Sequence, residues 1–491
     1  MGTYDVRQFI NECERLGDLK RIDGAEWDLE IGALTDLYRR RKVVLFDNIN
    51  GYTPGFRVLT NIFATDKQQK MVLGAPPEIG TLETVKFVRD KFAQIQRISP
   101  VKVKSGPVLE NVLMGTEIDL LKFPVPRWHE LDGGRYIGTA NLVVTRDPDE
   151  GWVNAGTYRV MVHDKKTAGC FMAPSRHGRM MMQKYWRKGE SCPVAVVCGQ
   201  DPLLLTVSSI SVPYGVCEYE YAGWFRGKPV EIIEAPITGL PVPASAEIVI
   251  EGEIPPPEVE SRKEGPFGEW TGYYGSGTRM EPIIQVKSIL HRNDPILCGV
   301  SAGSVPSESR RDLISSAIMW DQMEKAGVPD IRGVWRIEPG GSWLLTAISI
   351  KQRYPGHARQ AGLAAVSCRE GSNLNRFTIV VDDDIDPTNE DDVWWAMATR
   401  CDPATSIDIL PEGPSEPLDP MLDPEKRKVG NYTNSKAVIN ACRPYHWIDS
   451  FPTVVKMSTE LRDRILKKYK DVLTDLSKAD LERAANAKVA R

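Results

Sequence analysis

The segment 264–274, with the sequence Glu-Gly-Pro-Phe-Gly-Glu-Trp-Thr-Gly-Tyr-Tyr, places two carboxylates five residues apart. Its glycines and proline disfavour a helix and favour a tight, defined loop, which can hold Glu264 and Glu269 near one another. Two acids in a partly apolar cleft titrate apart, so that one stays protonated while the other carries charge. The pattern therefore predicts a device for proton transfer. The alternative is a charged loop that its aromatic residues anchor to the fold.

A second candidate cluster is the segment 154–159, with the sequence Asn-Ala-Gly-Thr-Tyr-Arg. The small residues allow a ligand to approach the backbone closely. The guanidinium of Arg159 can bind a carboxylate or a phosphate through two parallel hydrogen bonds. The alternative is a turn that leads into a strand, with Arg159 on the surface.

Two further segments carry groups that can bind an anion or a metal ion. His177 stands between Arg176 and Arg179 in a segment that contains Gly and Pro. Glu218 and Glu220 are expected on one face of a strand, where either could bind a metal. Oxygen ligands from Asn154 and Glu218, together with one imidazole, suit an ion such as Mn²⁺ or Mg²⁺ better than zinc. The alternative for His177 is a structural histidine.

The composition of the 491 residues is that of a globular protein with two to four domains. A formal net charge of −4 gives no electrostatic signature of nucleic-acid binding. The chain has neither an apolar run of roughly 18 residues nor the apolar core of a signal peptide. The nine cysteines are scattered, odd in number and without a Cys-x-x-Cys pair. We therefore expect a cytoplasmic protein without a disulfide framework, a zinc knuckle, a membrane span or a nucleic-acid partner.

The hydrophobic periodicity predicts a multidomain protein of the α+β and α/β classes. Residues 1–110 are expected to form an N-terminal α/β domain, with helices over 5–16, 30–40 and 81–98 and a buried strand over 43–46. Residues 111–300 carry short strands separated by Gly and Pro turns, which is typical of an antiparallel barrel or sandwich. These strands are predicted over 138–145, 158–162, 194–197 and 247–251, with a partly helical segment over 167–189.

Residues 301–491 again alternate between helix and strand signals, which indicates a C-terminal α/β domain. The helices are predicted over 310–325, 358–366 and 390–400, and the strands over 333–337, 343–350, 377–381 and 406–410. A capped amphipathic helix is predicted from Ser458 to about residue 476. Such a terminal helix docks on its own domain or on a partner subunit, and we favour the partner subunit.

Taken together, these motifs resemble those of the UbiD family of decarboxylases, which use prenylated flavin mononucleotide (prenylated FMN). The resemblance rests on Asn-x-Gly-Thr-Tyr-Arg, the following His, Glu-Tyr-x-x-Ala-Gly, Ala-Glu-Ile-Val-x-Glu-Gly and Glu-Gly-Pro-Phe-Gly-Glu, in that order along the chain. It continues through residues 350–359, 382–386 and 394–400 and so covers most of the chain. It implies a central split β-barrel that binds flavin and a C-terminal domain that mediates dimerisation.

The resemblance also implies a role for each matching residue. Asn154, His177 and Glu218 match positions that hold a divalent metal, usually manganese, on the cofactor phosphate, and a potassium ion commonly lies nearby. Thr157, Tyr158 and Arg159 match positions that contact the cofactor, and Arg176 is expected to join them. Arg159, Glu264 and Glu269 match a catalytic Glu-Arg-Glu network. In that network Glu269 is the proton donor, and the flavin serves as covalent electron sink.

The substrate implied by the family is a carboxylic acid that is decarboxylated reversibly and without oxidation. Trp270 is expected to line the substrate pocket and to offer a stacking surface, which favours an aromatic or heteroaromatic acid; alternatively it faces the core. Acids of the acrylic or polyprenyl-hydroxybenzoate type remain an alternative. A further alternative is a non-catalytic protein that binds flavin or phosphate. The expected partners are a flavin prenyltransferase that supplies the cofactor and a second copy of the chain, in a homodimer or an oligomer of dimers.

Overall fold

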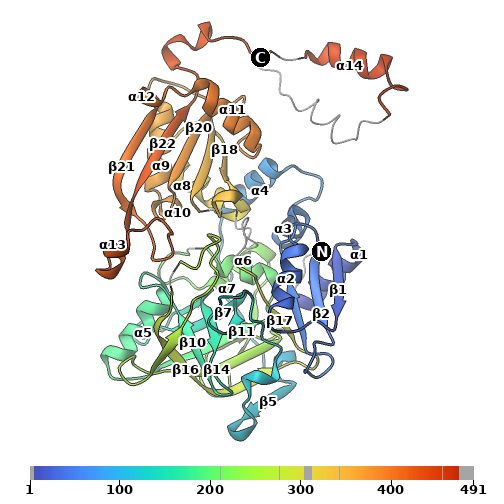
Figure 1. The fold of residues 1–491 in the computed structure, drawn as a ribbon, viewed down its shortest axis with the longest axis vertical. Helices are drawn as coiled ribbons and strands as arrows, with labels where there is room; N and C mark the ends of the chain where they lie inside the picture. The colour runs from blue at the N-terminus through green and yellow to red at the C-terminus, as the bar shows by residue number, and fades with distance from the viewer. Residues whose placement is uncertain are drawn as a thin grey trace.

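The computed structural model describes residues 5–210, 212–275, 277–302, 312–341, 343–455 and 457–474. Three main sheets organise these residues, and the sheet of the C-terminal part lies above the other two in Figure 1. No helix within these ranges is long and apolar enough to cross a membrane. All nine cysteines are free, as the spacing predicted.

The N-terminal sheet has four strands in the order β1-β2-β3-β17. Its strands are β1 (Leu19–Asp23), β2 (Val43–Asp47), β3 (Arg57–Thr60) and β17 (Ile296–Cys298). The helices of this part are α1 (Val6–Arg15), α2 (Glu30–Leu37), α3 (Asp66–Leu73) and α4 (Thr81–Ala93). Strand β17 pairs in parallel with β3, although it follows the central sheet in the chain. The sequence pattern assigned residues 296–298 to the central region and did not indicate that they form the last strand of the N-terminal sheet.

The central sheet has ten strands, and its neighbouring strands pair in the antiparallel direction. Its main path runs β6-β9-β10-β16-β14-β11-β7-β8, and β5 and β15 also pair with β16. The bounds are β5 (Asn111–Met114), β6 (Arg135–Gly138), β7 (Asn141–Arg146), β8 (Val153–Gly156), β9 (Arg159–Val162), β10 (Thr167–Phe171), β11 (Cys192–Cys198), β14 (Ile248–Ile254), β15 (Ser261–Glu264) and β16 (Arg279–His291). The curled sheet matches the antiparallel, barrel-like architecture that the sequence predicted.

Three helices lie beside the central sheet. They are α5 (His177–Arg187), α6 (Pro202–Ser208) and α7 (Glu218–Arg226). Helix α5 packs on β7, β8 and β11, and α7 packs on α6 and β8. A small sheet in the order β13-β12-β4 joins β13 (Pro241–Pro243), β12 (Glu231–Glu234) and β4 (Val101–Lys102). Short 3₁₀ helices η1 (Pro107–Leu109), η2 (Gly115–Glu117) and η3 (Leu120–Lys122) link these parts.

The predicted strand around Glu218 and Glu220 is wrong, because these residues begin helix α7. The alternation Glu-Tyr-Glu-Tyr resembles a strand over four residues. The buried Tyr219, Ala222 and Phe225, however, recur every three residues, which is a helical spacing. Glu220 consequently points away from Glu218 and lies 3.5 Å from the guanidinium of Arg97.

The C-terminal sheet has five strands in the order β18-β19-β20-β22-β21. They are β18 (Ile331–Arg336), β19 (Leu345–Ile350), β20 (Phe377–Asp382), β22 (Thr433–Ala441) and β21 (Ile407–Pro414). The helices are α8 (Asp312–Lys325), α9 (His357–Ser367), α10 (Arg369–Ser372), α11 (Glu390–Arg400), α12 (Pro403–Ser406) and α13 (Pro424–Lys428), with the 3₁₀ helices η4 (Glu338–Gly340) and η5 (Tyr445–Ser450). The helices and strands predicted for this part occur in the predicted order, with ends that shift by a few residues, but strand β22, which lies between β20 and β21, was not predicted. The first two residues of the predicted 310–325 helix lie outside the described residues.

Helix α4 and Arg40 join the N-terminal part to the C-terminal part. Helix α4 packs against α8. On this interface the guanidinium of Arg89 lies over the ring of Trp320, 4.5 Å from its centroid, and donates to Glu324 at 3.2 Å. Arg40, which follows α2, forms an ion pair with Glu338 of η4. These contacts hold the C-terminal part over the central sheet.

The terminal helix α14 (Thr459–Lys468) is shorter than the predicted span. Its predicted cap is confirmed, because the Ser458 side chain accepts a hydrogen bond from the backbone of Leu461. The helix lies apart from the three sheets in Figure 1, and none of its residues is buried.

Candidate active site

The two carboxylates of the 264–274 loop meet on one guanidinium. Glu264 ends β15 and Arg159 begins β9, and both strands belong to the curled central sheet. Arg159 donates from Nε and Nη2 to the two oxygens of Glu264, at 2.7 and 2.8 Å, and from Nη1 to Oε1 of Glu269. The side chains are only 7%, 1% and 6% exposed, in the order Arg159, Glu264 and Glu269. The structure thus brings together the three residues of the predicted network.

The network is buried and combines two carboxylates with only one guanidinium. Burial raises the pKa of Glu269 above its ordinary value, although the charge and hydrogen bond of Arg159 oppose this change. Burial disfavours the charge of Arg159, but Glu269 and Glu264 outweigh burial and raise the pKa of the guanidinium. One cation facing two carboxylates leaves a net charge of −1, which one proton neutralises. The arrangement favours a protonated Glu269 that can give a proton away.

The buried carboxylate of Asp132 fixes the loop that carries Glu269 through backbone hydrogen bonds. Its Oδ1 accepts from the backbone N–H of Gly268 at 2.9 Å, and its Oδ2 accepts from the N–H of His129 at 3.0 Å. The backbone carbonyl of Pro266 accepts a further bond from the N–H of Gly133 at 2.8 Å. A Cβ on Gly133 would lie 2.1 Å from the carbonyl oxygen of Gly265, so only glycine allows this approach. Sequence reasoning missed Asp132, because a lone Asp-Gly-Gly reads as an ordinary turn.

Aromatic rings enclose the guanidinium of Arg159. It lies 4.9 Å from the ring centroid of Phe171 and 4.8 Å from that of Phe267. A second guanidinium, that of Arg279, lies over the ring of Phe171, 4.0 Å from its centroid. The rings limit the motion of Arg159 and exclude water from its ion pairs, which strengthens them.

A second buried cluster surrounds Glu218, the first residue of α7. Its carboxylate accepts from Nδ2 of Asn154 at 2.8 Å and from the backbone N–H of Ala155 at 2.7 Å. The hydroxyl of Tyr158 donates to Oδ1 of Asn154 at 2.9 Å and accepts from the backbone N–H of Gly178, the second residue of α5, at 3.2 Å. Helices α5 and α7 therefore direct their N-termini, which attract anions, toward one place.

Two neighbouring cavities open between these clusters. The larger, of about 290 Å³, is lined by Arg159, Glu269 and mostly apolar side chains. The smaller, of about 170 Å³, is lined by Asn154, His177, Glu218 and several hydroxyl and guanidinium groups. Both cavities are lined by Thr157, Tyr158, Arg176 and Ser209. A molecule with a charged end and a flat apolar end would fit this pair of spaces.

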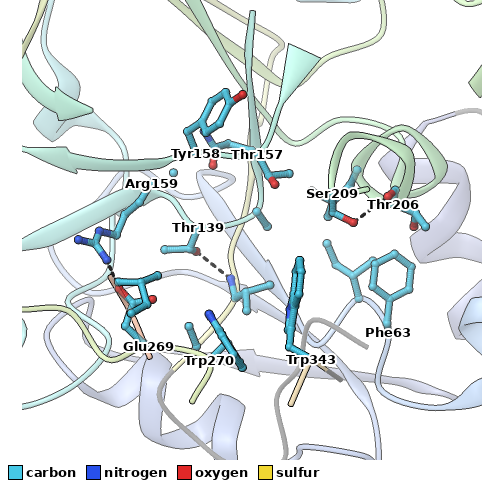
Figure 2. A pocket seen from close by; sticks show the side chains of 18 of the residues that line it. Phe63, Thr139, Thr157, Tyr158, Arg159, Thr206, Ser209, Glu269, Trp270 and Trp343 are labelled. Carbon is cyan, nitrogen blue, oxygen red and sulfur yellow. Dashed lines mark hydrogen bonds and ion pairs between the residues drawn. The ribbon is translucent and has the colours of Figure 1, made fainter. Parts of the chain in front are cut away.

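Trp270 lines the larger cavity, as the sequence predicted, and does not lie in the core. Figure 2 shows its indole between Glu269 on one side and Trp343 on the other, with Phe63 beyond. Thr157 and Tyr158 lie across the cavity from this row. Trp343 comes from the segment that precedes β19 and was not among the predicted site residues, because it is distant from every motif in the sequence.

Within the described residues, other predicted site residues contact neither the Arg159 network nor the Glu218 cluster through a side-chain hydrogen bond. Arg176 forms an ion pair with Glu416 at 2.9 Å. The ring of His177 packs edge-on against Trp152, with 5.4 Å between their centroids. Arg179, which the sequence grouped with His177, instead lies over the ring of Trp186. Sequence reasoning also missed Asn141 and Arg369, which line the larger and the smaller cavity respectively.

The smaller cavity has the chemistry of a site for a metal ion and a phosphate. Burial raises the pKa of Glu218 to about 7, and a cation beside it would keep it ionised. Burial, Arg369 and Arg176 lower the pKa of His177, which leaves a neutral imidazole able to bind a metal. The hydroxyl of Ser208, which lines this cavity, is buried and has no hydrogen-bond partner among the described residues.

The metal ligands predicted from the sequence include an amide, Asn154, beside one imidazole and one carboxylate. Within the described ranges, no group of three or more His, Cys, Asp or Glu side chains could hold a metal ion. The predicted site contains only two side chains of these types, so a metal there would depend on the amide oxygen and on the phosphate of a ligand.

Three family models match consecutive parts of this chain. The N-terminal, Rift-related and C-terminal domains of 3-octaprenyl-4-hydroxybenzoate carboxy-lyase, known as UbiD, match residues 10–86, 99–305 and 311–441. Together they cover most of the sequence.

Curated relatives match over nearly the whole chain. A pyrrole-2-carboxylic acid decarboxylase of Pseudomonas aeruginosa is 32% identical, with 96% of this chain and 98% of that protein covered. A phenolic acid decarboxylase of Escherichia coli O157:H7 is 33% identical, with 86% and 90% covered.

Solved structures of UbiD-class enzymes share the fold. The enzyme HmfF of Pelotomaculum thermopropionicum in complex with FMN has a TM-score of 0.83 at 27% identity, with 95% of this chain and 100% of that chain covered. An evolved dimeric form of HmfF with prFMN has a TM-score of 0.78 at 27% identity, with 93% and 99% covered. With the three domain matches and these relatives in agreement, the chain belongs to the UbiD family of carboxy-lyases.

Proposed function

We propose that this protein decarboxylates an aromatic or heteroaromatic carboxylic acid reversibly and without oxidation, with prenylated FMN as cofactor. The observation that carries the proposal is the buried network of Arg159, Glu264 and Glu269 at the wall of a cavity lined by aromatic rings. Relatives that act on pyrrole-2-carboxylic and phenolic acids support a substrate with a ring. The FMN and prFMN complexes of HmfF support the flavin.

Residues that line the two cavities would hold the cofactor. Asn154, His177 and Glu218 would hold Mn²⁺ and the cofactor phosphate at the smaller cavity, with a potassium ion nearby. Thr157, Tyr158 and Arg176 line both cavities and would contact the flavin. When bound, the prenylated flavin supplies the electron sink that protein side chains lack.

The side chains of the network supply the proton and hold its donor at the cavity wall. The bond between the ring carbon and the carboxylate breaks, carbon dioxide leaves, and Glu269 donates a proton to that carbon. Arg159 holds Glu269 at the cavity wall, and Glu264 holds Arg159 through two hydrogen bonds. In the direction of carboxylation, Glu269 would accept the proton instead.

A cavity of about 290 Å³ favours a small ring over a long polyprenyl chain. This volume lies at the lower end of the range of about 300–1,000 Å³ that ligand pockets commonly have. Acrylic-type and polyprenyl-hydroxybenzoate acids remain the second candidates. A panel that compares pyrrole-2-carboxylate, 4-hydroxybenzoate, cinnamate and a polyprenylated hydroxybenzoate for carbon dioxide release separates them.

Co-expression with a flavin prenyltransferase, the proposed supplier of the cofactor, tests the class of reaction. We expect the intact mass of the bound flavin to be that of prenylated FMN, and only this preparation to release carbon dioxide from the substrate. A protein that is loaded with prenylated FMN and inactive on every acid of the panel would contradict the proposal.

The exposed terminal helix supports assembly through the C-terminal part. Leu461 and Tyr469 are 37% and 38% exposed, and Val472, just beyond the helix, is 70% exposed. We propose that a second copy of the chain covers this apolar surface in a homodimer. Light scattering of the full chain and of a chain that ends before Ser458 measures the number of chains in each particle. If the full and the shortened protein contained the same number of chains per particle, this role of the helix would be contradicted.

A further inference from the structure

We infer that Trp343, together with Trp270, determines which ring the active site accepts. The inference rests on the proposed function and assigns a role in specificity to a residue outside every motif of the sequence. The two indoles form one wall of the larger cavity, and we call them the indole wall.

The indole wall is built from two distant parts of the fold. Trp270 follows the proposed proton donor directly in the chain, and Trp343 precedes the first residue of β19 in the C-terminal sheet. Their ring centroids are 6.0 Å apart and their planes are inclined by 39°. Figure 2 shows the row formed by Glu269, Trp270 and Trp343. A substrate whose reacting carbon lies at Glu269 therefore has its ring beside these indoles.

The position of the wall is fixed by its surroundings. A Cβ on Gly341 would lie 2.4 Å from Cε3 of Trp270, so the backbone of the C-terminal part rests on that ring. The guanidinium of Arg336 lies 5.8 Å from the ring of Trp343. Glu338 of η4, in the same segment, forms the ion pair with Arg40. These contacts hold Trp343 at the cavity.

The opposite side of the cavity is formed by Thr157 and Tyr158, which line both cavities and are proposed to contact the cofactor. The space left for substrate lies between that side and the indole wall. A flat ring fits such a space because aromatic rings attract one another in offset and tilted arrangements. Trp343 limits the length of the ring system, because its indole follows that of Trp270 in the row that begins at Glu269. The geometry points to acids with one ring.

The experiment compares Trp343→Leu and Trp343→Phe with the wild type, all loaded with cofactor. The substrates are pyrrole-2-carboxylate and 4-hydroxybenzoate, with one ring, and indole-3-carboxylate and 2-naphthoate, with two. For the better one-ring acid we expect Trp343→Leu to raise KM about tenfold with little change in kcat, because a lost ring contact weakens binding by about that factor. The same variant should gain turnover of a two-ring acid. Trp343→Phe should stay close to the wild type in KM for the one-ring acid.

The control is Trp394→Leu, which removes an indole of helix α11 that is 45% exposed and does not line the cavity. It should leave both KM and the choice of ring unchanged. Wild-type KM and an unchanged preference for one ring in Trp343→Leu would overturn the inference. So would equal losses of kcat in the Leu and Phe variants with no change in KM.

A binding measurement separates this inference from the proposed reaction. Calorimetry with the FMN-loaded protein measures the affinity for the one-ring acids without turnover. Weaker binding by about tenfold in Trp343→Leu, but not in Trp394→Leu, supports the indole wall even if no acid is decarboxylated. Equal affinity of Trp343→Leu and wild type overturns it even if the wild type is active.

Discussion

Replacing Asp132 by alanine tests whether the carboxylate behind the 264–274 loop positions Glu269, the proposed proton donor. The change removes the acceptor of two backbone N–H groups, those of Gly268 and His129, and leaves the buried N–H of Gly268 without its partner. A hydrogen bond to a charged group contributes about 1.5–3 kcal/mol, so two of them give a loss of about 3–6 kcal/mol in the free energy of unfolding. Asp132→Asn retains one acceptor oxygen and should lose about half as much.

The effect on catalysis should fall on kcat. Asp132 does not line the larger cavity, so substrate binding is expected to change little. A shift of the reacting group by 1 Å costs about 100-fold in rate, and we expect a loss of that order in Asp132→Ala. Asp132→Asn should recover most of it.

The assay combines urea unfolding, followed by tryptophan fluorescence, with steady-state decarboxylation of the same cofactor-loaded preparations. A matched control is Asp149→Ala, because this exposed aspartate pairs with Lys188 at the surface at 2.7 Å. If Asp132→Ala lost stability as expected and kept the wild-type kcat, Asp132 would be a structural residue only. If KM rose while kcat stayed unchanged, the loop would act in binding and the reasoning would be refuted.

The other predictions concern the proton donor and the cofactor site. Glu269→Gln should abolish decarboxylation yet keep the bound cofactor, as measured by carbon dioxide release and by intact mass; near-normal turnover would contradict the role of Glu269. Because burial raises the pKa of Glu269, kcat/KM should fall as the pH rises past that raised value, where the donor has lost its proton. The charge of Arg279 opposes the rise, so Arg279→Gln should move this alkaline limb to higher pH, and an unmoved limb would exclude that influence. The raised pKa also means that the free energy of unfolding of the cofactor-free protein should decrease as the pH rises between the ordinary and the raised pKa of Glu269, and Glu269→Gln should remove that part of the slope. His177→Ala should lose metal and flavin together, as measured by metal analysis and mass spectrometry, and retention of both would argue against the site in the smaller cavity.

Much of the site was predictable because its chemistry lies in short motifs. The loop with Glu264 and Glu269 and the segment from Asn154 to Arg159 each contain their functional groups within a few residues, and glycines mark the close approaches of the backbone. The structure adds that Arg159 itself joins the two carboxylates. Pairing of strands in the central sheet brings them together, which periodicity alone does not reveal.

The missed residues share a different property, which is that their neighbours come from distant parts of the chain. Asp132 has no motif around it, and its role exists only because Gly268 lies against it. Trp343 meets Trp270 through the placement of the C-terminal sheet over the central one. The wrong strand at Glu218 has a local cause, since four alternating residues fit a strand and a helix equally well until the buried Phe225 is counted.

The pairing of β17 with β3 bears on how the chain matures during synthesis. The last strand of the N-terminal sheet comes from residues 296–298, so the sheet is incomplete until the ribosome has passed the whole central sheet. Arg7 of α1 likewise finds its partner, Glu247 at 2.8 Å, far along the chain. Until then β3 presents an unpaired edge, which is a place where strands of other nascent chains can add. The N-terminal sheet and helix α1 thus take part of their pairing from residues that the chain supplies only after most of the central sheet.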